Sequence, residues 1–162
     1  YLCSTVCQQY LKNASNPHII NISPPINLAP GWFKSHVAYT QAKYLMSMST
    51  LGMSAAFKAQ NIAVNSLWPM TAIDTAAVRN LLPIDPKYCR KDKIMADAAY
   101  LLAQEKSSEV TGEFYIDESY LRSKGMTDFS EYACEPGEKL IQDAFIGDPT
   151  SIFQFINDKD SK

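Results

Sequence analysis

A tyrosine and a lysine one helical turn apart are the residues in this sequence best suited to chemistry. Tyr39 and Lys43 lie in a stretch with a helical pattern, so their Cβ atoms are expected about 5–6 Å apart on one face. A free phenol has a pKa of about 10 and transfers protons poorly at neutral pH. A neighbouring ammonium group stabilises the phenolate and lowers that pKa, which favours general acid–base catalysis.

The surroundings of this pair distinguish it from a chance match, because Tyr120 and Lys124 have the same spacing. Before Tyr39, residues 18–23 form an apolar run with β-branched side chains that ends in two prolines. After Tyr39 comes a long helical pattern over residues 36–60. Tyr120 has no such frame, so the context favours the first pair.

A second strand-like run, residues 62–68, follows the long helix and ends at Pro69. Strand, loop, helix and strand in this order predict a βαβ crossover and a parallel sheet with a site at the carboxyl ends of its strands. Residues 93–104 are predicted as a further helix, and residues 113–117 as the last strand. The sequence therefore predicts an α/β fold.

Several separate motifs, in the right order, resemble the short-chain dehydrogenase/reductase family. They are Asn21-Ile-Ser23, Tyr39-Thr-Gln-Ala-Lys43, Asn65-Ser-Leu-Trp-Pro69 and Thr111-Gly112-Glu113-Phe-Tyr-Ile-Asp117. The amino-acid sequences of residues 21–25, 67–73 and 96–100 are similar to those of the hydroxysteroid dehydrogenase-like members of that family. The resemblance implies a Rossmann-like, doubly wound parallel sheet. It also implies that this chain carries the C-terminal half only, a βαβ crossover plus a last strand.

The resemblance also implies roles for single residues and a nicotinamide cofactor, NADP(H). Tyr39 would donate or accept the proton, and Lys43 would lower its pKa and bind the nicotinamide ribose. Ser23 is the third catalytic candidate, and the candidate cofactor-binding residues are Tyr39, Lys43, Pro69, Thr71 and Ile73. The implied reaction is hydride transfer between an alcohol and a carbonyl.

Two positions depart from the family pattern. Pro24, which has no hydroxyl, stands where the family places its catalytic serine, and Ser23 is one residue early. Because successive residues of a strand point to opposite faces, the orientation of Ser23 decides whether it can replace that serine, and the sequence leaves this question open. Met70 stands where the family has a glycine, so the loop on the nicotinamide side is expected to take another path, through Thr71 and Ile73.

No glycine-rich phosphate loop occurs in the sequence. The six glycines are Gly31, Gly52, Gly112, Gly125, Gly137 and Gly147, and they form no Gly-x-Gly-x-x-Gly pattern. Two hypotheses therefore stand. One is an NADP(H)-dependent oxidoreductase whose catalytic half is this chain. The other is a non-catalytic fragment or isoform that lacks the dinucleotide-binding half and acts as an interaction module.

Composition narrows the classes of partner. The chain has 162 residues, 46% hydrophobic and 20% charged, with a formal net charge of −2. This suits one soluble globular domain, and it predicts neither nucleic acid as a partner nor a membrane span. The four cysteines and two histidines have no metal-ligand spacing, so no metal is expected. An intracellular location is expected, in peroxisome or mitochondrion by the resemblance, although the chain shows no targeting signal.

Residues 1–117 are predicted to be the dehydrogenase part, and residues 118–162 an acidic extension packed on the same domain. From Asp117 onward, ten acidic residues stand against five basic ones. Short helices are expected near residues 119–124 and 150–158. Irregular chain is expected between them.

The helix over residues 36–60 carries an apolar stripe, which consists of Tyr44, Met48, Leu51 and Ala55. Small residues occupy much of the rest. Two explanations remain open for this surface: a homodimer through the helix, which the resemblance implies, or packing within the same chain.

Residues 70–89, interrupted by prolines, are where the resemblance places a substrate lid, and their apolar side chains indicate a small apolar, lipid-like carbonyl or alcohol substrate. The charged run from Arg90 to Lys93 is either an anion site or, more commonly for such runs, a solvated helix start.

Overall fold

The computed structural model describes residues 1–149 and 155–156. The helices are α1 (Leu2–Leu11), α2 (Gly31–Lys34), α3 (Val37–Phe57), α4 (Ala76–Leu81), α5 (Lys93–Gln104) and α6 (Asp117–Ser123), with short 3-10 turns at Lys58–Gln60, Pro86–Tyr88 and Ser130–Tyr132. The strands are β1 (His18–Ile22), β2 (Ala63–Trp68), β3 (Phe114–Ile116), β4 (Leu140–Ile141) and β5 (Phe155–Ile156).

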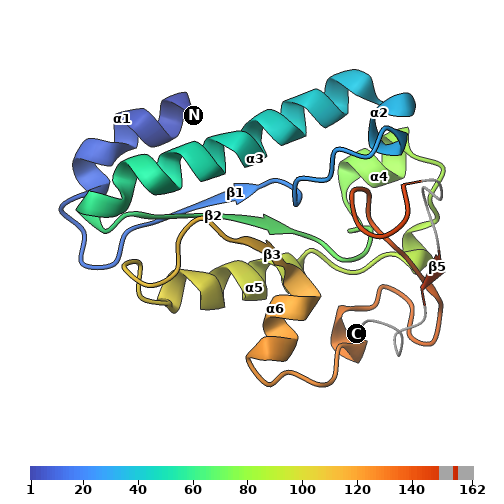
Figure 1. Cartoon of the computed structure of the whole chain (residues 1–162). Helices are drawn as coiled ribbons and strands as arrows, with labels where there is room; N and C mark the ends of the chain where they lie inside the picture. Colours follow the sequence, from blue (N-terminus) through green and yellow to red (C-terminus); the bar gives the residue numbers. More distant parts are fainter. Residues whose placement is uncertain (150–154, 157–162) are drawn as a thin grey trace. The chain divides into compact units, whose positions relative to one another are not determined.

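The predicted βαβ crossover is confirmed. Strands β1 and β2 are parallel and in register from His18 opposite Ala63 to Ile22 opposite Leu67, and α3 connects them (Figure 1). All six residues of β2 are buried, as expected for an inner strand of an α/β sheet. Strand β3 joins the other side of β2 to give the order β1-β2-β3.

Side chains of β2 fix the segment that leads into β3. The Asn65 carboxamide donates to the Val110 carbonyl (2.9 Å) and accepts the Glu113 N–H (3.0 Å). The Val64 N–H donates to the Thr111 hydroxyl at 3.1 Å. Gly112 lies at φ +84°, and a Cβ there would meet the Ser54 hydroxyl at 3.1 Å. The Asn65 and Thr111–Gly112 motifs therefore serve strand placement.

Helix α3 buries hydroxyl-bearing side chains together with Met53 and Phe57, and it leaves most of the apolar stripe exposed. Its buried residues are Thr40, Tyr44, Ser47, Thr50, Met53, Ser54 and Phe57. Of the predicted stripe only Tyr44 is buried, and Met48, Leu51 and Ala55 are exposed. Of the two uses left open for this stripe, packing within the same chain therefore applies to Tyr44 alone, because buried hydroxyl side chains with partners inside the protein provide the rest of the contact with the sheet.

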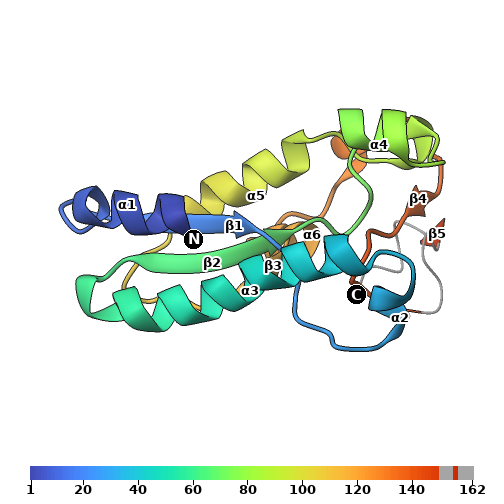
Figure 2. The same ribbon diagram turned by 90° about the horizontal axis from the view of Figure 1, so that it is seen from above.

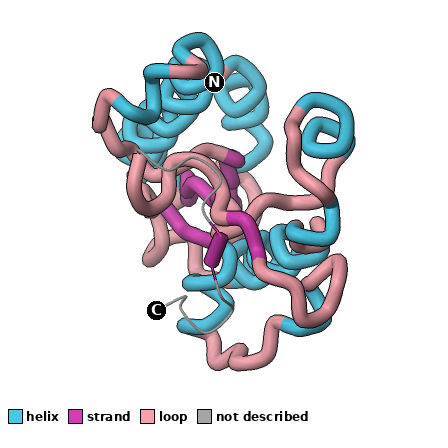
Figure 3. The backbone as a smooth tube through the Cα atoms, turned by 90° about the vertical axis from the view of Figure 1, so that its right-hand side faces the viewer, coloured by secondary structure: helices cyan, strands magenta, loops and turns pink. Residues whose placement is uncertain are grey.

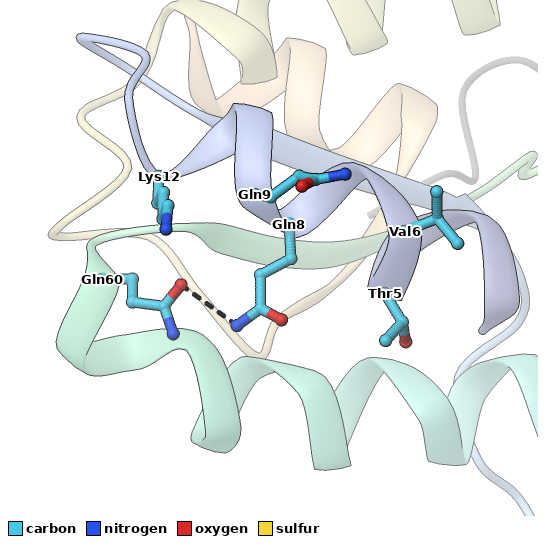
Figure 4. Close-up of a pocket in the computed structure, with 6 residues that line it drawn as sticks. All are labelled: Thr5, Val6, Gln8, Gln9, Lys12 and Gln60. Carbon is cyan, nitrogen blue, oxygen red and sulfur yellow. Dashed lines mark hydrogen bonds between the residues drawn. The ribbon is translucent and has the colours of Figure 1, made fainter.

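Helix α1 lies on the same side of β1 and β2 as α3 (Figures 1 and 2). Leu11 packs against the core cluster that contains Met53, Phe57, Ile62 and Val64. A surface pocket lies beside it, lined by Thr5, Val6, Gln8, Gln9, Lys12 and Gln60 (Figure 4). Gln8 donates to Gln60 across it at 3.0 Å. The pocket has no carboxylate or histidine, so we do not assign it a catalytic role.

The chain divides into two compact units. The first comprises residues 1–68 and 99–115, and the second residues 69–98 and 116–162. The predicted acidic extension falls in the second unit together with residues 69–98. Figure 3 shows in pink how much of the backbone between the short strands consists of loops and turns.

The second unit has its own apolar core and its own strand pairing. Its core cluster contains Ala72, Val78, Ile84, Cys89 and Ile141. Strand β4 pairs antiparallel with β5, Leu140 opposite Ile156.

The helix predicted near residues 119–124 is confirmed as α6. Within the range predicted as a second helix, residues 155–156 form strand β5 instead, because they pair with β4, and a pairing between segments distant in the sequence leaves no local sequence pattern. The other residues of that range, 150–154 and 157–158, lie outside the described part.

In the part of the chain that the structure describes, no helix has both the length and the apolar character needed to cross a membrane.

Candidate active site

Tyr39 and Lys43 project from the first two turns of α3, in the first unit. Tyr39 is half exposed, with 50% of its surface accessible. The Lys43 ammonium donates to the Ile22 carbonyl at 3.1 Å, where β1 ends, and lies 5.3 Å from the centre of the Trp68 ring. Both contacts come from the carboxyl ends of the parallel strands, where α/β folds place their sites.

The second pair with the same spacing is different. Tyr120 lies on α6 and is 6% exposed, and the Lys124 ammonium lies over its ring at 5.3 Å from the centre. Since a proton-transfer group must reach its substrate, the accessible Tyr39 is the better candidate of the two tyrosines.

Ser23 is fully buried, and its hydroxyl is 2.7 Å from the Ser66 hydroxyl of β2. Ser66 is in turn 3.0 Å from the Thr50 hydroxyl, which accepts a hydrogen bond from the Asn21 side chain at 2.8 Å. The structure thus joins Ser23 to a chain of buried hydroxyls between α3 and the sheet. Its surroundings contrast with those of the half-exposed Tyr39.

Three side chains of α3 hold the loop between β1 and α3 by hydrogen bonds to its carbonyl groups, and the sequence did not reveal this role. Thr40 donates to the Trp32 carbonyl (2.7 Å) and Tyr44 to the Asn27 carbonyl (2.5 Å).

The third of these side chains is Ser47, which donates to the Pro24 carbonyl at 2.7 Å. Burial raises the pKa of Tyr44, consistent with a structural phenol. The spacing of Thr40, Tyr44 and Ser47, four and then three residues, is the signal that could have revealed these hydrogen bonds.

The predicted cofactor-binding residues Pro69, Thr71 and Ile73 lie together in one segment of the second unit and are all buried. The Thr71 hydroxyl is buried and has no hydrogen-bond partner within the described residues. Among those residues, only Asn61 and Phe145 are non-glycines with positive φ. Met70 therefore follows an ordinary path and does not need the freedom of the glycine it replaces.

Each unit by itself offers a polar group of the kind that the nicotinamide end of a dinucleotide requires. Thr71 offers a buried hydroxyl with unused hydrogen-bonding capacity, and the Lys43 ammonium can donate to a ribose hydroxyl. The sequence contains no glycine-rich loop for the phosphates.

The hypothesis of an anion site on the charged run from Arg90 is wrong for Arg90 itself, and so is the solvated alternative. Arg90 is buried and forms an ion pair with buried Glu118, which also accepts from Arg122 at 2.5 Å. Lys93 remains at the surface and pairs with Asp97 at 2.5 Å. Arg90 thus holds the second unit together.

Comparison with known proteins shows which proteins this chain is similar to. The chain is 51% identical to hydroxysteroid dehydrogenase-like protein 2 of Danio rerio over 154 residues, which are 94% of this chain and 37% of that protein. A crystal structure of a short chain dehydrogenase from Mycobacterium thermoresistibile superposes with a TM-score of 0.80 and 40% identity, covering 91% of this chain and 53% of that one. The chain is related to the short-chain dehydrogenases.

A provisionally named dehydrogenase from Xanthomonas campestris agrees, with a TM-score of 0.87, 41% identity and coverage of 91% of this chain and 54% of that one. No family model matches the chain. The predicted relationship to short-chain dehydrogenases and the α/β fold class are therefore confirmed. The chain spans little more than a third of the curated relative and about half of each solved structure.

Proposed function

We propose that this chain supplies the proton-transfer residues of an NADP(H)-dependent oxidoreductase that interconverts an alcohol and a carbonyl. The observation that carries the proposal is the accessible Tyr39 one turn before a lysine whose ammonium is fixed at the end of β1. The relationship to short-chain dehydrogenases supports it.

Each residue has a distinct part in the proposed reaction. The cofactor, when bound, supplies or accepts the hydride. Tyr39 gives a proton to the oxygen of the carbonyl substrate, or takes one from the alcohol in the reverse direction. Lys43 favours the phenolate form of Tyr39 by its charge and donates to the nicotinamide ribose. Pro69, Thr71 and Ile73 contact the nicotinamide end of the cofactor.

For Ser23 we propose a structural role and not a catalytic one. Its hydroxyl is buried against Ser66, within hydrogen-bond distance, so reaching a substrate would require breaking that contact. Tyr39 and Lys43 then act without a serine partner from this position.

An apolar substrate is proposed from the segment around α4. Leu81 and Leu82 are exposed there, next to the buried core residue Val78. Exposed apolar side chains on a short helix between prolines suit contact with a lipid-like carbonyl or alcohol.

The test is a titration of the 162-residue chain with NADPH and, in parallel, NADH, followed by cofactor fluorescence. Saturable NADPH binding that Lys43→Ala weakens at least about tenfold supports the proposal, because the variant loses a charge-assisted donor. No binding by the folded wild-type chain would contradict it for this chain.

Turnover of a panel of apolar carbonyls is measured with this chain or with a longer protein that contains it, whichever binds the cofactor. Tyr39→Phe is expected to abolish turnover and leave the Kd for NADPH nearly unchanged, because only the proton-transfer group is removed. Tyr120→Phe is the matched control and should change neither. A large loss of turnover in Tyr120→Phe would mean that the wrong pair was chosen.

We also propose that α3 forms a homodimer surface. Val37, Leu45, Met48 and Leu51 are exposed on α3, and Leu45 is 64% accessible. Exposed apolar side chains gathered on one helix mark an interaction site. Wild-type chain is expected to elute as a dimer in light-scattering chromatography and Leu45→Glu as a monomer. Leu81→Glu, a control at a more exposed leucine of the second unit, should leave the dimer intact.

A further inference from the structure

The backbone of Met70 is engaged on both sides within the second unit. Its N–H donates to the Asp117 carboxylate at 2.8 Å, and its carbonyl accepts the Asp143 N–H at 3.1 Å. Both partners come from the part of the chain that follows β3. The residue that replaces the family's glycine is thus held by a carboxylate and by the acidic extension.

The following residues are held along two edges. On one edge, the Ala72 N–H donates to the Ile141 carbonyl at 2.8 Å, and Thr71 pairs antiparallel with Gln142. On the other edge, the Arg90 N–H donates to the Ala72 carbonyl (2.9 Å).

The Asp74 N–H closes that second edge by donating to the Arg90 carbonyl at 2.8 Å. Residues 70–74 are therefore the middle segment of a three-segment backbone ladder. A segment paired on both edges has little freedom to change its path.

Asp117 stands out within this arrangement because it is fully buried. Its Oδ1 accepts both the Met70 N–H and, at 2.6 Å, the Glu118 N–H at the start of α6. Its Oδ2 is buried with no hydrogen-bond partner within the described residues. A buried carboxylate is costly, and nothing in the ladder itself requires a charge at this position. Through the Met70 N–H, Asp117 is linked to the predicted cofactor segment.

We propose that Asp117 is a positioning residue that, together with residues 141–143, holds the segment 70–74 in the path needed to present Thr71 to the nicotinamide end of the cofactor. This inference rests on the proposed function. Asp117 itself does not touch the cofactor, and it acts through the backbone of Met70.

The experiment measures hydrogen–deuterium exchange of residues 70–75 and, separately, the Kd for NADPH, in the full 162-residue chain. Asp117→Ala is expected to speed exchange of the Met70 amide at least about tenfold, because that N–H loses its buried acceptor. It should also weaken NADPH binding several-fold. Asp117→Asn keeps an acceptor oxygen and should restore both values toward wild type.

Two control variants separate positioning from other effects. Asp128→Ala removes an exposed carboxylate of the same unit that accepts the Ser130 N–H, and it should change neither value. Thr71→Val should weaken NADPH binding without speeding exchange, since it removes the contact and leaves the ladder in place.

Unchanged exchange in Asp117→Ala would overturn the inference. Faster exchange with an unchanged Kd would also overturn it, because Asp117 would then be structural only. If wild-type chain binds no NADPH while Asp117→Ala exchanges faster, the proposed function fails for this chain and the hold of Asp117 on the segment is supported. If Asp117→Ala does not fold, Asp117→Ser takes its place, and Asp117→Asn remains the variant that keeps the acceptor oxygen. Exchange in Asp117→Ser as slow as in Asp117→Asn and wild type would overturn the inference.

Discussion

Asp117→Asn is expected to stabilise the chain at neutral pH, although it changes a fully buried side chain. Burial raises the pKa of Asp117 to about 6 from its ordinary value of 3.8, against the opposing effect of the Met70 and Glu118 N–H groups and of Arg90. The folded chain therefore binds the proton more tightly than the unfolded chain does. That contribution to stability is present at low pH and is lost as the pH rises through about 6.

The difference between the two pKa values corresponds to about 3 kcal/mol at neutral pH. An amide cannot ionise, so Asp117→Asn should recover up to that amount at pH 7.5 and little near pH 4. The assay is urea unfolding followed by circular dichroism at several pH values between these limits.

Asp128→Asn is the matched control. Hydrogen bonds from Ser130 lower the pKa of Asp128, so its loss should reduce stability at neutral pH or leave it unchanged. Equal destabilisation by Asp117→Asn at pH 4 and pH 7.5 would refute the reasoning, because the hydrogen bonds of the carboxylate would then outweigh the cost of burying its charge.

Two further stability predictions follow from the hydrogen-bond and ion-pair geometry. Thr40→Val should lower the free energy of unfolding by about 1–3 kcal/mol, because it removes the hydroxyl that donates to the Trp32 carbonyl at 2.7 Å. Ser49→Ala, which removes an exposed hydrogen bond of α3, should cost less than about 0.5 kcal/mol. Urea unfolding of both variants measures the two values. Arg90→Leu should cost up to about 3–5 kcal/mol, because the buried Glu118 charge would keep only the guanidinium of Arg122 as a partner. Adding Glu118→Leu should recover part of this loss, and a double variant as unstable as Arg90→Leu alone would contradict that account.

The sequence was sufficient for those parts of the fold that local patterns determine. Strands β1 and β2 and helix α5 were predicted within a residue or two, because each is a long periodic or continuously apolar run bounded by proline or polar residues. Strands β4 and β5 were missed. They are two residues long, and they exist only because segments distant in the sequence pair with each other.

The candidate site shows the same division. The Tyr39 and Lys43 pair could be located from its spacing and its strands. The sequence could not show that Ser23 faces Ser66 or that Arg90 is buried, because both depend on contacts between residues far apart in the chain. The path of Met70 was also beyond prediction, since the partners that hold it lie 47 residues away at Asp117 and beyond.

The three bonds that pin the loop before α3 also determine its alignment on the helix. Thr40, Tyr44 and Ser47 meet the carbonyls of residues 32, 27 and 24, so the loop runs back along the helix as the helix advances. If the loop slid by a single residue, all three carbonyls would leave their donors together. A loop shifted by one residue would thus lose all three hydrogen bonds at once, so only one alignment of the loop on the helix is stable. The position of this loop along α3 is consequently set when the chain folds, before any ligand arrives.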